Sequence, residues 1–297
     1  LGDVYKRQRL FIVNLKQLTY LFILGLLLSC GEANRHETVA GGYGIGEKNG
    51  DLRIGQWAFY RDDASKVSLG NFDKDLEEGA WQFWYKNGNL EEESNWKLGL
   101  LDGEFKSYHE NGNIKAQGTF SSNQYNGKWS WYDENGSIES RGEYINNLKT
   151  DKWEWFYPNG ELKEIVHYKD SILNGAILSW FDNGEQSAKK EFKDGERHGE
   201  WTFWYYNGNL RDISIWDNGV LNGKSTAYHR NGAVDYEGTY INGSEAGIFT
   251  WYYPDGGIKM QGNFEEGKKN GIFNFYNDLG ELQVTEEYKN DVIVEED

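Results

Sequence analysis

The chain has 297 residues, of which 16% are aromatic, and its net charge is −17. A surface this acidic repels nucleic acid and anionic lipid headgroups, so we expect no nucleic-acid partner and a preference for basic partners. A solvated acidic surface without any partner is the alternative. The one cysteine excludes an internal disulfide framework.

The first 29 residues have the pattern of a leader. Residues 1–8, LGDVYKRQ, resemble the translated end of a sequencing transposon, and residues 9–29 read as a signal peptide. Basic Arg9 and Lys16 precede an apolar run of 11 residues over 18–28, which is too short to cross a bilayer. The run ends in LLSC, which resembles the lipobox of bacterial lipoproteins, with Cys30 as the residue that receives the lipid.

This leader predicts a lipoprotein of the cell envelope, on the outer membrane or the surface of a Gram-negative bacterium. The lipid would be its only contact with the membrane. A soluble chain with one stray thiol is the alternative. Residues 30–54 would then contain the lipidated cysteine and a Gly-rich tether, with GEKNGDLRIG from Gly46 as a candidate capping hairpin.

Residues 55–297 form ten units of 24 residues. With Gly55 as position 0, nine of the ten equivalent positions are Gly, and Asp151 is the exception. Every twelfth residue from Tyr60 to Tyr288 is aromatic, twenty in succession, which places a ring at +5 and at +17 of every unit. A period of this length indicates a repeat array in which each unit contacts only its neighbours.

Each unit has the pattern of a β-hairpin. Positions +2 and +4 are mostly aromatic, Asn-Gly stands at +8/+9 in seven units, and +11 is apolar in eight. Alternation with period two is typical of strands, and Asn-Gly suits a two-residue turn because both residues accept positive φ. Pro158 and Pro254 at +7 favour instead a type I turn followed by a Gly bulge. We reconcile the two with one β-bulge near +4/+5, which sends +2, +4, +5, +11 and +17 to one face.

The predicted fold is therefore all-β: an elongated array of about ten 24-residue antiparallel hairpins in one long twisted sheet or trough. A glycine at +15 is expected to lie beneath the ring at +2 of its own hairpin, as Gly118 beneath Phe105. The acidic C-terminal residues would cap the last open edge.

At this point the residues resemble a known family. GKWSWYDENGSIESRGEY and GEWTFWYYNGNLRDISIW are similar to the MORN-repeat variant of bacterial antitoxins of the YwqK type. The resemblance covers Gly55 to about Glu287. It implies protein binding: neutralisation of a co-encoded toxin in that family, and scaffolding or dimerisation in MORN repeats generally.

Motifs for catalysis are not apparent. His109 and His229 occupy the same repeat position and so do not form a dyad, and no metalloprotease, nucleophile-elbow or phosphate-loop motif occurs. The stretch DENGSIE from Asp133 faintly resembles a calcium loop, but its relatives HENGNIK and YPNGELK lack the acids. We therefore expect no enzyme, no cofactor and no metal.

Two functions are weighed. The first is a non-catalytic, surface-tethered protein-interaction scaffold, antitoxin- or immunity-like toward a basic toxin, with a homodimer as another partner. The alternative is a glycan-binding module that uses exposed Trp platforms. Because the +2/+4 rings are interrupted in two units, we predict that they bind the partner: Trp129, Trp131, Trp153, Trp155, Trp201 and Trp251. Because the +5 rings have no exception, we predict that they are the buried structural set: Tyr60, Trp84, Tyr108, Tyr132, Phe156, Trp180, Trp204, Tyr228, Tyr252 and Tyr276.

Overall fold

The structure is a computed structural model that describes residues 35–39 and 41–294. The predicted artefact (1–8), the signal peptide (9–29) and Cys30 lie outside the described residues. Within the described part every regular element is a β-strand, as the hairpin periodicity predicts.

Two strands precede the ten units and a short one follows them. The first strands are β1 (Arg35–Val39) and β2 (Gly42–Asn49). The strands that open the units are β3 (Leu52–Arg61), β5 (Leu76–Trp84), β7 (Leu100–Tyr108), β9 (Gln124–Tyr132), β11 (Leu148–Phe156), β13 (Ile172–Trp180), β15 (Glu196–Trp204), β17 (Val220–Tyr228), β19 (Ser244–Tyr252) and β21 (Lys268–Tyr276). The returning strands are β4 (Lys66–Asp73), β6 (Leu90–Lys97), β8 (Ile114–Ser121), β10 (Ile138–Ile145), β12 (Leu162–Lys169), β14 (Gln186–Lys193), β16 (Leu210–Asp217), β18 (Val234–Ile241), β20 (Ile258–Glu265) and β22 (Leu282–Lys289), and β23 (Val292–Ile293) is last.

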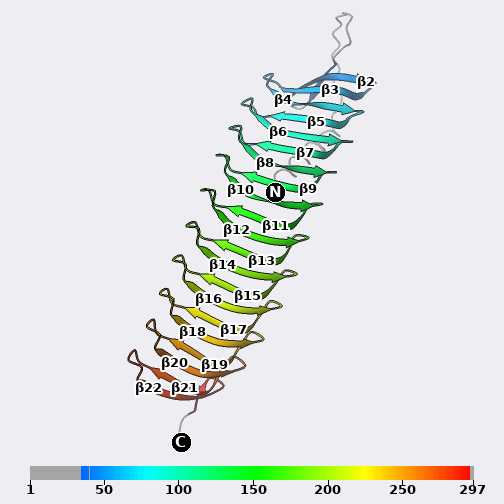
Figure 1. Ribbon diagram of the computed structural model, residues 1–297. Coiled ribbons are helices and arrows are strands. Elements are labelled where there is room, and N and C mark those ends of the chain that lie inside the picture. The colour runs from blue at the N-terminus through cyan, green and yellow to red at the C-terminus, as the bar shows by residue number, and fades with distance from the viewer. Residues whose placement is uncertain (1–34, 40, 295–297) are drawn as a thin grey trace, which may run out of the picture. The chain divides into compact units, whose positions relative to one another are not determined.

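Each strand pairs antiparallel with the next strand of the chain, from β1 to β23, in one open sheet (Figure 1). This confirms the predicted array of hairpins; the sheet does not curl on itself into a closed barrel. The tether expected before the repeats is wrong over residues 35–54, because β1, β2 and the start of β3 are paired strands there. The candidate capping hairpin is present as β2–β3, with Asn49 opposite Leu52.

The Asn-Gly loops adopt the alternative turn that the prolines indicated. In the β5–β6 loop Gly88 N donates to Tyr85 O over 3.1 Å, and only Gly88 of the pair takes positive φ (+89°). This is a type I turn followed by a Gly bulge. The Asn side chain makes two hydrogen bonds of its own. Its Oδ1 accepts from Asn89 N (2.9 Å), and its Nδ2 donates to Glu110 O of the next loop (2.9 Å). The asparagine therefore clamps successive units together.

The two-residue turns lie between units, at +19/+20. Asn146 and Asn147 both have positive φ (49° and 69°) and connect the paired residues Ile145 and Leu148, which defines a type I′ turn. These turns are also linked along the array: Asn147 N donates to Tyr125 O (3.0 Å), and Asn147 Oδ1 accepts from Tyr125 N (2.8 Å). Hydrogen bonds thus join the turns along both edges of the ladder.

Each hairpin contains the predicted irregularity, but on the other strand. In β9–β10, Trp131 pairs with Ser140 and Tyr132 with Ile138, so the extra residue is Glu139 at +12 of the returning strand. The opening strand keeps its alternation, and Tyr132 therefore points away from Trp131. The prediction that +5 shares a face with +2 and +4 is wrong for this reason.

The sheet accordingly has two distinct faces. The aromatic face carries positions +2, +4, +13, +15, +17 and +22; in β9–β10 these include Trp129, Trp131 and Tyr144, whose rings contact one another. The polar face carries +1, +3, +5, +14 and +16. There Tyr132 Oη accepts a hydrogen bond from Gln117 Nε2 (2.9 Å).

The core is the +2 column of the aromatic face, and it is buried in all ten units. Each ring lies over the +15 residue of the preceding unit: a Cβ on Gly118 would lie 2.2 Å from Trp129 Cδ2. Trp129 Nε1 donates to Thr119 O (3.0 Å), beside a break in strand register at Gly118. The predicted ring-over-glycine contact exists, but between units rather than within one hairpin, where Gly118 only pairs with Phe105.

Candidate functional site

The aromatic face is where the predicted partner-binding residues divide into two groups. Trp129, Trp153 and Trp201, all at +2, are 1%, 2% and 8% exposed. Trp131, Trp155 and Trp251, all at +4, are half-buried. The expected exposure of the +2 rings is wrong, because rings of the preceding hairpin and of their own strand pack against them. Of these six residues, only the three at +4 retain surface that a partner could contact.

The +5 column is not the buried core that its regularity suggested. All ten of these rings are half-buried on the polar face. Several use their hydroxyl groups there: Tyr108 Oη donates to Glu93 Oε2 (2.7 Å), and Tyr252 Oη donates to Glu237 Oε1 (2.9 Å). The predicted core set and the predicted exposed set at +2 are therefore reversed.

The aromatic face holds cations of the chain itself. Lys149 Nζ lies 4.2, 5.1 and 5.3 Å from the ring centroids of Trp153, Trp155 and Tyr168, and burial lowers the pKa of its ammonium group. Equivalent residues at +22 do the same in other units, where guanidinium or ammonium groups lie over +2 and +17 rings: Arg53, Arg197 and Lys269. Ammonium and guanidinium groups are attracted by the negative face of such rings.

One open hollow of about 360 Å³ lies on this face at the eighth unit. Its floor is formed where Ser225 and Ala227 replace the usual rings at +2 and +4. Trp216, Asp212 and Tyr236 also line it. Tyr236 fills part of the vacated space, since its hydroxyl lies 3.4 Å from Ser225 Oγ.

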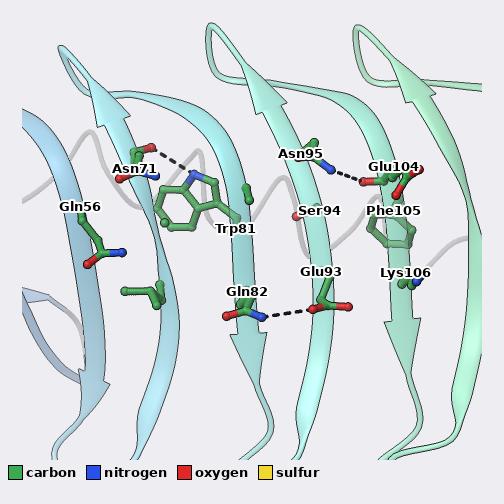
Figure 2. Close-up of a pocket in the computed structure, with 13 residues that line it drawn as sticks. Gln56, Asn71, Trp81, Gln82, Glu93, Ser94, Asn95, Glu104, Phe105 and Lys106 are labelled. Carbon is green, nitrogen blue, oxygen red and sulfur yellow. Dashed lines mark hydrogen bonds between the residues drawn. The ribbon is translucent and has the colours of Figure 1, made fainter.

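The polar face has a shallow hollow of about 410 Å³ across β3–β7, which Figure 2 shows. Its side chains are used in cross-strand hydrogen bonds: Gln82 Nε2 donates to Glu93 Oε1 (3.1 Å), and Asn95 Nδ2 donates to Glu104 O (3.1 Å). Hydrogen bonds from Tyr108 and Gln82 lower the pKa of Glu93. A carboxylate that is held ionised in this way ties strands together.

Two of the histidines take part in the contacts between successive units. His109 Nε2 lies 2.9 Å from Tyr132 O and His229 Nε2 lies 3.0 Å from Tyr252 O, the same +6 contact that tyrosine hydroxyls make in other units. No group of three or more metal-ligating side chains occurs within residues 35–39 and 41–294. In the same part of the chain no helix is long and apolar enough to cross a membrane.

The MORN repeat variant family model matches seven segments, which together make up half of the chain: residues 77–98, 101–121, 125–146, 152–170, 197–218, 221–242 and 246–266. The chain belongs to the MORN repeat variant family. MORN repeats are generally protein-interaction or binding repeats, and this general description applies to the chain as a member of the family. Each matched segment begins near the opening strand of a unit and ends with the returning strand, so the family repeat and the structural hairpin coincide.

None of the curated proteins compared with the chain matches it. Among solved structures, the TcdB2–TccC3–Cdc42 crystal structure matches with 11% identity and a TM-score of 0.18. The TcdB2–TccC3–TEV crystal structure matches with 11% identity and a TM-score of 0.16. Each match covers 86% of the MORN-repeat chain. It covers 16% of the solved chain, so this protein spans about one sixth of the length of the chains it matches.

Proposed function

We propose that the chain is a non-catalytic scaffold that binds a protein partner through its aromatic face. The observation that carries the proposal is the +4 column, because its rings lie half-buried on an open face of the sheet, as Trp131 and Trp155 do. Half-exposed aromatic rings are enriched in protein interfaces, where they bury a large area at low entropic cost. The net charge of −17 favours a basic partner, such as a toxin to which this chain confers immunity.

A photo-crosslinking amino acid tests the proposal. It is placed at Trp131 on the aromatic face and, as the matched control, at exposed Lys128 on the polar face of the same strand. We expect a basic protein to be crosslinked in cells from position 131 and not from 128. Binding is then measured with the purified partner. Crosslinking from 128 alone would refute the assignment of the face.

A glycan ligand is the second candidate, and the hollow beside Trp216 favours it, since a half-buried indole next to hydroxyl and carboxyl groups suits a pyranose. Soluble mono- and oligosaccharides that change the tryptophan fluorescence of the wild type would support this candidate. They should have no effect on a Ser225→Trp variant, whose hollow is filled.

The surface tether is part of the same proposal. Cys30→Ser should move the protein from the membrane fraction to the soluble fraction, because no lipid would be attached. Fractionation followed by immunoblotting measures this. Retention of the Ser variant in the membrane would remove the lipoprotein assignment and leave the binding proposal unaffected.

A further inference from the structure

The aromatic face follows a rule that links two columns. The +13 residue of one unit lies directly opposite the +4 residue of the next, and a +4 ring covers the residue opposite it. A Cβ on Gly44, for example, would lie 2.7 Å from Phe59 Cε1. Wherever +4 is aromatic, the preceding partner is uncharged: Gly44, Ser68, Ala116, Ser140, Ala188, Tyr236 and Met260.

The three units without a +4 ring break this pattern in the same way. In each, the +4 residue faces an acidic residue at +13 of the preceding unit. On its other side this acidic residue pairs with the +4 residue of its own unit, which is aromatic. We call these cross-strand triplets the acidic rows: Phe83–Glu92–Ser107, Trp155–Glu164–Ser179 and Phe203–Asp212–Ala227. A carboxylate therefore lies beside an aromatic ring, at the place where a covering ring is missing.

The third acidic row shows which chemistry such a row accommodates. Arg211 Nε lies 2.6 Å from Asp212 Oδ2, and the same guanidinium lies 4.6 Å from the centroid of Phe203. A guanidinium group from the chain itself is thus held by the carboxylate and the ring together. Arg211 is exposed, and the hollow of the eighth unit opens beside it.

The first two acidic rows have the same carboxylate and ring without such a cation. Glu164 Oε1 accepts a hydrogen bond from Ser179 Oγ (2.9 Å), and Glu92 is bonded to Ser94. Among the described residues, neither carboxylate has a basic group within 4 Å in an ion pair. Burial raises the pKa of Glu92 to about 7, which is the response of a carboxyl group without a counter-ion.

Resting on the proposed function, we propose that the first two acidic rows bind arginine or lysine side chains of a basic protein partner. Each cation would lie between a carboxylate and an aromatic ring, as Arg211 of the chain itself does in the third row. Glu92 and Glu164 are three units apart. At about 4.8 Å per strand, these two rows are about 29 Å apart, so one extended basic surface can reach both. The spacing selects partners whose basic side chains match it.

The test uses an acetylated octa-arginine amide as the probe and the octa-citrulline peptide, which has the same shape without charge, as its control. Binding to the full chain is measured by calorimetry at 150 mM salt. Two double variants each replace two carboxyl groups: Glu92→Gln/Glu164→Gln in the rows, and Glu104→Gln/Glu139→Gln at exposed positions outside them. We expect the row variant to lose at least tenfold in affinity and the other variant less than threefold.

A third variant, Ser107→Trp/Ser179→Trp, restores the covering rings of the first two rows. It should keep the fold and weaken arginine binding, which separates lost binding from lost structure. Equal losses of affinity in both double variants, or equal binding of the citrulline peptide, would overturn the proposal that these rows bind basic side chains. A pyranose that competes at these rows would reassign them to glycan. None of these outcomes affects the crosslinking test at position 131, which decides the proposed function separately.

Discussion

Trp129→Ala and Tyr132→Ala form a pair that tests which aromatic column holds the fold together. Trp129 is 1% exposed, and its ring centroid lies 4.5 Å from that of Tyr125 and 5.1 Å from that of Phe120. Removing such a side chain costs about 3–5 kcal/mol through lost burial and the cavity that remains. Thr119 O also loses its bond from the indole, which adds about 1 kcal/mol.

Tyr132→Ala should lower the free energy of unfolding much less. Its ring is half-buried on the polar face, and its hydroxyl takes part in one hydrogen bond, with Gln117. Loss of that bond and of partial burial amounts to about 1–2 kcal/mol. Trp129→Phe is the control: an aromatic ring stays, as in Phe105 at the same position, while the bond to the carbonyl and part of the buried ring volume are lost.

Urea unfolding followed by circular dichroism measures the overall effect. Hydrogen exchange of β8–β10 is needed beside it, because a long repeat array can open locally rather than in one step. We expect exchange in these strands to accelerate strongly in Trp129→Ala and slightly in Tyr132→Ala. If Tyr132→Ala were as destabilising as Trp129→Ala, the assignment of the core to the +2 column would be refuted.

Four further predictions concern single residues. Gly127→Ala should cost about 1–2 kcal/mol, since φ is +71° and no atom lies within 4 Å of the new Cβ, and asparagine should be better tolerated there than alanine. Gly118→Ala should cost about 1–3 kcal/mol for a steric reason, which asparagine cannot relieve. Asn111→Ala should cost about 1–2 kcal/mol, whereas Asn111→Asp should recover the turn bond but not the bond to the next loop; urea midpoints distinguish these variants. Because the pKa of Glu92 is raised from 4.5 to about 7 in the fold, stability should fall as pH rises through this window, and Glu92→Gln should remove that fall.

The sequence predicts the hairpin, its length and the pairing of +2 with +15. Side chains alternate between the two faces of any strand, and the 24-residue repeat fixes the length of each hairpin, so both can be read without knowing the packing. It misplaces the +5 ring for a physical reason. A bulge can insert its extra residue on either strand, and the aromatic pattern does not say which. With the extra residue at Glu139, Tyr132 remains on the polar face.

The two turns show a similar limit. Asn-Gly at +8/+9 is the stronger hairpin signal, yet the type I′ turn lies at +19/+20, where the residues vary, as in Asn146-Asn147 and Asp170-Ser171. The signal for this turn is weaker but present, since +20 is always Gly, Asn, Asp or Ser. The clamp between loops through Asn87 Nδ2 could not be read from one unit, because its acceptor belongs to the next.

The regular columns of the array account for its fold, and its binding chemistry is therefore sought in the exceptions. At Ser107 the +4 ring is missing, and a larger apolar residue opposite it would refill the core with the smallest loss of stability. The chain instead places Glu92 there, and burial of this carboxyl group raises its pKa to about 7. The same choice recurs at Ser179 and Ala227. In all three units a carboxylate follows the missing ring and does not refill the core, which is the placement that the proposed binding of cations requires.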